Sequence, residues 1–185
     1  MKFVTALPVL LFVLGLAGCS STTPPERADE KRQIDASVNN VLPQLYRNVP
    51  DSQDVANKAQ GVLVFPDVYK AAIGVGGEYG KGALRVRGNT AGYYSIASGS
   101  VGLQLGAEAR NIVFMFMTPE ALVKFRDSPG WQADATAGVA WVKKGAEGSV
   151  NTSQINAPVI AFVFGNTGLI ADVSVGAMKI SKLEP

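Results

Sequence analysis

The chain has 185 residues, of which 47% are hydrophobic and 17% are charged, and its formal net charge is +2. This composition is typical of one globular domain with a sizeable core, and a nearly neutral chain lacks the concentrated basic surface that nucleic-acid binding needs. The sequence has no histidine and one cysteine, which excludes a Ser-His-Asp triad, a Cys-His pair and the usual zinc sites. We therefore expect no catalysis, no cofactor, no metal and no nucleic-acid partner.

Residues 1–18 have the features of an export signal. Lys2 gives a positive start, residues 6–16 form an apolar run, and small residues precede Cys19. This order is typical of a signal peptide, and the run is several residues too short to span a bilayer. The sequence Leu-Ala-Gly-Cys ending at Cys19 also resembles the bacterial lipobox. That resemblance implies cleavage after Gly18 and acyl chains on Cys19, whereas an ordinary signal peptide would leave a free thiol in an oxidising compartment.

The residues after the cysteine bear on location. Ser20 stands where, in the rules for lipoproteins, an aspartate implies retention in the inner membrane. The resemblance therefore implies the outer membrane of a Gram-negative bacterium, on its periplasmic side. Residues 19–26 are predicted to be a lipidated polar tether, which would hold the domain within about 20 Å of the bilayer.

Residues 27–60 are predicted to form an N-terminal helical segment. Its apolar positions recur at steps of three and four and face a charged remainder; they are Ile34, Val38, Val41, Leu42 and Leu45. Pro43 is expected to kink or end this helix, and a second helix is expected from Asp51 or Ser52, as N-cap, to Gln60. The apolar stripe can either pack on the domain core or enter a lipid interface. Its lack of Trp and Phe favours packing.

After Gly61 the hydrophobic period changes to two, and residues 61–185 are predicted to form a β-rich core, with residues 27–185 as a single domain. The expected strands are residues 62–65, 71–77, 83–87, 92–97, 101–109, 112–117, 137–142, 159–164 and 169–180. One internal helix is expected from its cap at Thr118 to Asp127. The predicted fold class is mainly β (α+β), an antiparallel, barrel-like or two-layer sheet with N-terminal amphipathic helices and nearly closed edges.

Small residues recur at every second position of the β-rich part, at Gly74 and Gly76 and again at Gly80 and Gly82. A strand face without side chains lets another backbone, a helix or a ligand approach closely. Two interpretations follow, which are tight curvature with close packing, or a lipid groove.

Four stretches of the sequence resemble a known family. They are AQGVLVFPDVYKAAIGVGGEYGKGALRVRG, TAGYYSIASGSVGLQLGAEARNIVFMFMTPEALVKF, PGW and APVIAFVFGNTGLIADVSVGAMKI. Spread over residues 38–182, they resemble the SYLF lipid-binding domain, and more narrowly its bacterial lipoprotein branch. The resemblance implies a lipid-binding module without established catalysis. Eukaryotic members are associated with phosphoinositides and some with actin. A periplasmic protein meets neither of these, so the ligand expected here is a phospholipid or another amphiphile.

Anionic headgroups are bound by basic side chains that lie beside apolar anchors. The candidate lipid-binding residues are Lys58, Lys70, Lys81, Arg85, Arg87, Lys143 and Lys144. Arg85 and Arg87 are two apart and are expected on one strand face. For each basic residue, a solvated surface charge is the competing interpretation. Tyr93, Tyr94 and Trp131 are candidate interfacial anchors, with a place in the core as their alternative.

Two other functions remain open. Glu78 and Glu108 lie in glycine-rich strands and could face each other as the carboxylate pair of a periplasmic glycosidase, although ordinary exposed glutamates explain them better. The other candidate is a structural envelope lipoprotein that contacts another envelope protein. The sequence barely separates this function from lipid binding.

We predict that Cys19→Ser abolishes labelling by radioactive fatty acid and releases the protein from the membrane fraction, because the sulfur that would carry an acyl chain is gone. Ser20→Ala is the matched control and should leave labelling and fractionation unchanged. A Cys19→Ser protein that stays labelled and membrane-bound would contradict the anchor.

Overall fold

A computed structural model describes residues 24–73, 75–101, 106–133, 135–142, 156–165, 168–169 and 178–184. The predicted signal, Cys19, Lys143 and Lys144 lie outside the described residues. The elements in chain order are α1 (Pro24–Asn48), α2 (Ser52–Lys58), β1 (Gly61–Ile73), β2 (Val75–Val86), β3 (Asn89–Val101), β4 (Gly106–Phe116), α3 (Pro119–Asp127), β5 (Trp131–Ala133), a 3-10 helix (Ala135–Ala137), β6 (Val139–Val142), β7 (Val159–Gly165), β8 (Gly168–Leu169) and β9 (Met178–Leu183).

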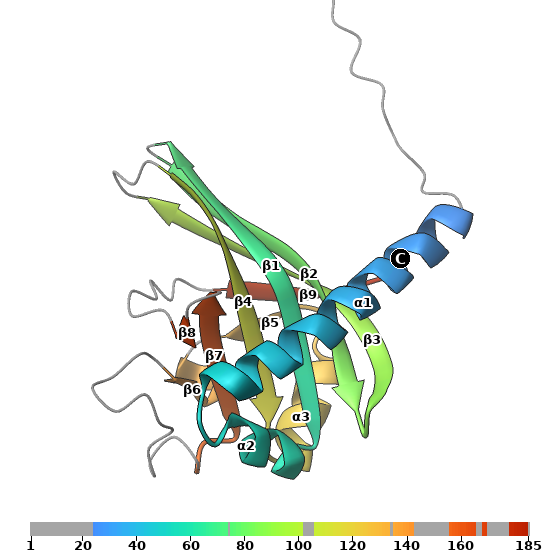
Figure 1. Cartoon of the computed structure of the whole chain (residues 1–185), viewed down its shortest axis with the longest axis vertical. Coiled ribbons are helices and arrows are strands. Elements are labelled where there is room, and N and C mark those ends of the chain that lie inside the picture. Colours follow the sequence, from blue (N-terminus) through green and yellow to red (C-terminus); the bar gives the residue numbers. More distant parts are fainter. Residues whose placement is uncertain are drawn as a thin grey trace, which may run out of the picture.

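The described strands form one sheet that curls into a nearly closed barrel (Figure 1). Their order is β5-β9-β3-β2-β1-β4-β7-β6, and β8 pairs with β7. The pairs are antiparallel except β6 with β7, which is parallel. The predicted mainly β, barrel-like fold is confirmed, while purely antiparallel pairing fails at this one pair.

Aromatic side chains fill the interior of the barrel. The ring centroid of Phe114 on β4 lies 5.7 Å from that of Trp131 on β5 and 5.6 Å from that of Trp141 on β6. Since β5 and β6 are the two ends of the strand order, their shared contact with one ring shows how nearly the barrel closes. α3 adds Phe125, which is 1% exposed, to the same core. Trp131 and Tyr94 are buried there, so they are core residues and not interfacial anchors.

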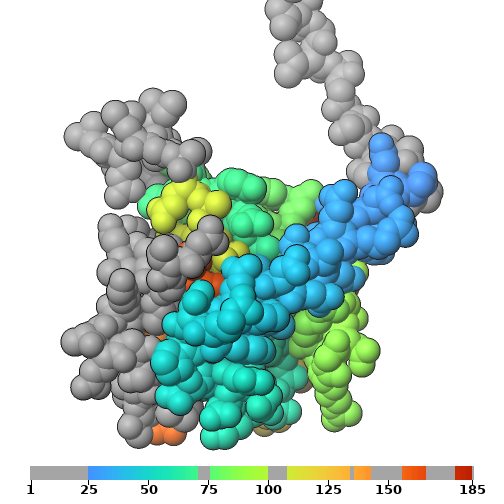
Figure 2. Space-filling model, in the orientation of Figure 1, coloured from blue at the N-terminus to red at the C-terminus, as the bar shows by residue number. Residues whose placement is uncertain are grey.

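The first helix packs on the outer face of the barrel. Its predicted apolar stripe is buried, since Ile34 and Val41 are 7% and 5% exposed and Val38 and Leu45 are fully buried. The helix crosses β1 and β2 diagonally (Figures 1 and 2). Burial of such a stripe, more than intrinsic propensity, is what stabilises a helix in a protein. The stripe therefore packs on the core, as the packing interpretation predicted.

The helical segment starts earlier than predicted, and Pro43 does not end it. α1 begins at Pro24, inside the predicted tether, and it continues through Pro43 to Asn48. Buried Leu45 and Val49 hold its last turns on the barrel, which offsets the roughly 3 kcal/mol cost of an internal proline. At the start of α2 no side-chain cap bond forms.

The prediction of Asp51 or Ser52 as the N-cap of α2 is confirmed for Asp51. Asp51 occupies the N-cap position with a left-handed φ of 64° and without a side-chain bond to the helix. The Ser52 hydroxyl donates to the carbonyl of Val49 at 2.7 Å and is fully buried. α2 then ends at Lys58, two residues before the predicted end.

β1 is longer than predicted because the strand passes through a β-bulge. The sequence suggested a strand end before Pro66 and Asp67, yet β1 pairs with β2 and with β4 on both sides of these residues. Asp67 adopts a left-handed φ of 47°, and its N–H donates to the amide oxygen of Asn111 at 3.1 Å. A bulge inserts one extra residue and changes which side chains face the core.

Beyond the bulge the side chains of β1 alternate in a new phase. Val68 is fully buried in the interior core, so Tyr69 points outward and Lys70 points inward. Lys70 was predicted to lie between two strands, but it lies within β1. The strand predicted over residues 71–77 is divided between β1 and β2, which pair on either side of residue 74.

The later elements agree with prediction in type but shift at their ends. Residues 106–109 and 112–117 belong largely to a single strand, β4, and residue 137 belongs to the 3-10 helix that precedes β6. Of the strand predicted over residues 169–180, residues 170–177 lie outside the described residues. α3 is confirmed with its cap, because the Thr118 hydroxyl accepts from the N–H of Ala121 at 3.2 Å.

Two glycines of β2 mark a close approach of β1. A Cβ atom at Gly82 would lie 2.0 Å from the carbonyl oxygen of Val64, and one at Gly80 would lie 2.8 Å from the side chain of Val68. No larger residue fits at Gly82 unless the backbone of β1 moves. At these two positions close packing, and not a lipid groove, explains the small residues.

We predict that Leu45→Ala lowers the free energy of unfolding by about 2–5 kcal/mol, because it leaves a cavity between α1 and the barrel. Chemical denaturation followed by circular dichroism measures the change. Asn40→Ala, at an exposed position of the same helix, should change the free energy by less than about 0.5 kcal/mol. Equal effects of the two substitutions would mean that α1 does not pack on the barrel.

Candidate functional site

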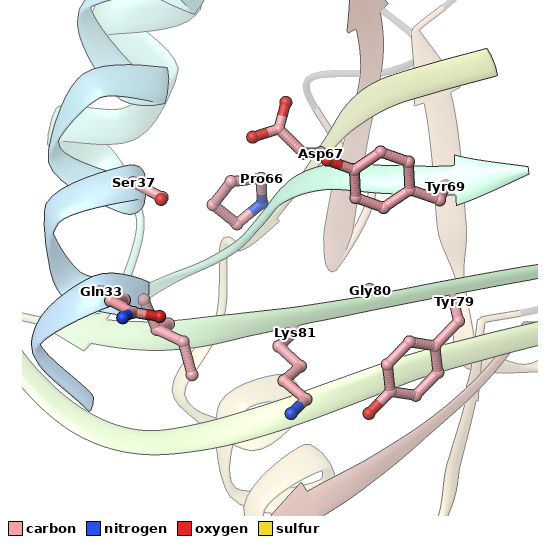
Figure 3. A pocket seen from close by; sticks show the side chains of 9 residues that line it. Gln33, Ser37, Pro66, Asp67, Tyr69, Tyr79, Gly80 and Lys81 are labelled. Carbon is pink, nitrogen blue, oxygen red and sulfur yellow. The ribbon is translucent and has the colours of Figure 1, made fainter. Parts of the chain in front are cut away.

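An open pocket of about 450 Å³ lies on the outer face of the barrel, between α1 and the bulged part of β1 (Figure 3). The residues that line it are Gln33, Ile34, Ser37, Pro66, Asp67, Tyr69, Tyr79, Gly80 and Lys81. We call it the tyrosine pocket. One wall comes from the N-terminal half of α1 and the other from β1 and β2, so the docking of the helix creates the pocket.

Two exposed tyrosines distinguish this pocket. Tyr69 and Tyr79 are directly opposite each other on β1 and β2, and their side chains are 66% and 50% exposed. In the same row across the sheet lie Ala109 on β4 and Ala97 on β3, both exposed. Large apolar groups that gather at the surface mark an interaction site more often than a single exposed one does. The row is therefore a smooth surface from which two rings project.

The pocket contains charges of both signs. The ammonium group of Lys81 pairs with the carboxylate of Glu30 on α1 at 2.5 Å, and the Lys81 side chain is 42% exposed. The hydrogen bond to Glu30 raises the pKa of Lys81, so this group stays charged at neutral pH. Asp67 is exposed, and in Figure 3 its carboxylate and the Lys81 ammonium group point away from each other.

Arg85 connects α1 to the sheet. Its guanidinium lies 3.1 Å from the Asp35 carboxylate, donates to Asn39 at 3.0 Å and also donates to the Thr90 hydroxyl. Asp35 accepts further hydrogen bonds from Thr90 at 2.9 Å and from Tyr93 at 2.8 Å. Burial, and then the bond to Asp35, raise the pKa of Tyr93. Arg85 and Tyr93 thus hold the helix in place.

The expectation that Arg85 and Arg87 share a strand face is wrong, because β2 ends at Val86. Arg87 lies in the following turn with a left-handed φ of 52°. Both arginines nevertheless line a second pocket, of about 460 Å³, between α1, α2 and the start of β1. We call it the arginine pocket. Lys58 is exposed at the end of α2.

The barrel interior holds a buried ion pair that the sequence analysis did not identify. Arg110 on β4 and Glu78 on β2 lie 2.5 Å apart, and their side chains are 1% and 5% exposed. Lys70 stands between Glu78 and Glu108 in the strand register. The Glu78 carboxylate is paired with Arg110 and is buried away from solvent. This ion pair gives no support to Glu78 and Glu108 as a pair of catalytic carboxylates. The signal that points to the pair is Arg110 on the same strand face as the apolar Ile112 and Phe114.

The sequence analysis also missed the two tyrosines, because it placed Tyr69 and Tyr79 between strands. Pro66 within an apolar run, with a residue that tolerates a left-handed conformation after it, is the signal for a bulged strand that continues. Over the described ranges, no helix is long and apolar enough to cross a membrane. In the same ranges, no three potential metal-ligating side chains gather.

Fold and site define a small barrel-like β domain with a helix packed across its outer face and an open pocket beside that helix. The model of a protein family described as "Ysc84: Las17-binding protein actin regulator" matches residues 97–184. Over these residues the chain matches the SYLF family, which is the family that the sequence resembles. No curated protein matches the chain. The matched range begins in β3, so it includes Arg110 but neither Cys19 nor the tyrosine pocket.

We predict that Glu78→Gln lowers the free energy of unfolding by about 3–5 kcal/mol, because it leaves the charge of Arg110 buried without a counter-charge. The double substitution Glu78→Leu with Arg110→Met should cost much less, because it removes both charges from the interior. Chemical denaturation compares the variants, with the exposed Glu108→Gln as the control. A double variant as unstable as Glu78→Gln would contradict this account.

Proposed function

We propose that this protein is a lipid-anchored module that binds phospholipid or another amphiphile through the tyrosine pocket, without catalysis. The observation that carries the proposal is the pair of exposed rings, Tyr69 and Tyr79, at an open pocket beside a helix. A tyrosine side chain has an apolar body and a polar tip, which suits the boundary between lipid and water. The match to the SYLF family supports a lipid-binding role.

The anchor at Cys19 is part of this proposal, as is a location at the outer membrane on its periplasmic side. α1 begins five residues after Cys19, a distance of at most about 18 Å in a fully extended chain. At a rise of 1.5 Å per residue, residues 33–37 lie about 14–20 Å along α1 from its start, whereas residues 42–46 lie about 27–33 Å along it. The tyrosine pocket is therefore closer to the anchored end than the arginine pocket is.

The basic residues divide into unequal roles. Among the described candidates, Lys81 lines the tyrosine pocket, and Lys58 and Arg87 are exposed elsewhere. A basic group near an anionic surface contributes about 1 kcal/mol. We infer that Lys81, Lys58 and Arg87 add a modest, salt-sensitive attraction to an anionic surface. Arg85 does not contribute, because its side chain is bound to Asp35 and Asn39 of α1.

We predict that the chain from Ser20 onward co-sediments with phospholipid vesicles, and that Tyr69→Thr with Tyr79→Thr weakens this binding roughly 30-fold. Each ring lost removes on the order of 1 kcal/mol of apolar burial. The described helices and strands all lie after residue 23, and threonine suits a strand, so the variant should keep the fold. Val123→Thr, at a 55% exposed position of α3, is the matched control.

Two outcomes would count against the proposal. Vesicle binding that survives the loss of both rings would place the site away from the tyrosine pocket. If the intact chain binds neither neutral nor anionic vesicles across a salt series, the envelope lipoprotein that recognises another protein becomes the better candidate.

A further inference from the structure

We propose that the tyrosine pocket binds a zwitterionic phospholipid headgroup, with its ammonium group at Asp67 and the two tyrosines and its phosphate at Lys81. This inference rests on the function proposed above and specifies the ligand of the same pocket. It differs from the expectation drawn from the basic residues, which favoured an anionic headgroup.

The charges of the pocket carry the inference. One carboxylate, Asp67, and one ammonium group, Lys81, line it, and Glu30 adds a second carboxylate against Lys81. A headgroup with negative charge alone would gain from Lys81 but would be repelled by the two carboxylates. A headgroup with both charges complements Asp67 and Lys81 together, since these groups point to different sides of the pocket (Figure 3).

The surroundings of Asp67 suit an ammonium group. Tyr69 follows two residues later on β1, and Tyr79 is opposite Tyr69 on β2. Aromatic faces beside a carboxylate are the usual way in which proteins bind alkylammonium groups. The left-handed bulge itself does not require a negative charge, because asparagine or glycine serves that conformation as well.

The surroundings of Lys81 suit a phosphate. Glu30 takes one of the three N–H donors of the ammonium group, which leaves donors for a second oxygen ligand. Gln33 and Ser37 of α1 line the same pocket with an amide and a hydroxyl, both of which can donate to phosphate or glycerol oxygens. Lys81 and Tyr79 are two residues apart on β2 and line the same pocket, so its two parts are adjacent (Figure 3).

The test compares Asp67→Asn with the unaltered chain from Ser20 onward, on vesicles of phosphatidylcholine and on vesicles of phosphatidylglycerol. Asparagine keeps the shape and tolerates the left-handed backbone, and thermal unfolding checks that the fold is unchanged. We expect Asp67→Asn to weaken binding to phosphatidylcholine roughly three- to tenfold, the loss of one charge-assisted contact. Binding to phosphatidylglycerol should stay the same or become tighter, because a repulsive charge is gone. Asp127→Asn, exposed at the end of α3, should change neither.

The outcomes separate this inference from the proposed function. If the chain binds vesicles but Asp67→Asn leaves phosphatidylcholine binding unchanged, or weakens both lipids equally, the headgroup assignment is overturned and the lipid-binding function stands. If the unaltered chain binds neither vesicle, both are overturned. Titration with glycerophosphocholine distinguishes the source of the headgroup. If the unaltered chain binds glycerophosphocholine, Asp67→Asn does not, and neither protein binds vesicles, a membrane lipid is overturned as the ligand.

Discussion

The bulge in β1 is the constraint on which the site depends. Before it, Leu63 and Phe65 point into the barrel; after it, Val68 does so. Without the extra residue, the alternation of the strand would turn Tyr69 into the apolar core and Lys70 out to solvent. The hydrogen bond from the backbone of Asp67 to Asn111 fixes the bulge against the neighbouring strand. A single local irregularity thus brings an exposed ring and a carboxylate to one wall of a pocket.

The other wall depends on how the helix is held. Apolar contacts under α1 supply the affinity for the barrel, and polar contacts at its flank set its position. Asp35 and Arg85 fix the middle of the helix, and Glu30 and Lys81 fix the turn beside the tyrosine pocket. Lys81 both pairs with Glu30 of α1 and lines the pocket. A ligand that binds Lys81 is therefore coupled to the docking of α1.

Much of the fold is predictable because local patterns determine it. The stripe of α1, the cap of α3 at Thr118 and the β-rich core all follow from spacing and residue type. The bulge follows from them only in part, because Pro66 and Asp67 suit it locally but the side chain that stabilises Asp67 is 44 residues later in the sequence. Arg110 and Arg85 also have partners on distant elements, since Glu78 is 32 residues from Arg110 and Asn39 is 46 residues from Arg85. Sequence reasoning therefore placed Arg85 among the headgroup ligands and did not single out Arg110. A cross-strand register is what brings Tyr69 and Tyr79 together, and no local pattern specifies it.

The packing of α1 also bears on the order in which the molecule can assemble. The cluster that buries its stripe includes Ile160, Phe162 and Phe164 of β7. A chain is made from its N-terminus, so the helix is complete long before the last part of the surface that covers it exists. Contacts this far apart in sequence form slowly. An amphipathic helix therefore waits with its apolar side uncovered while the sheet closes. It is during this interval, and not in the finished fold, that the stripe of α1 is uncovered.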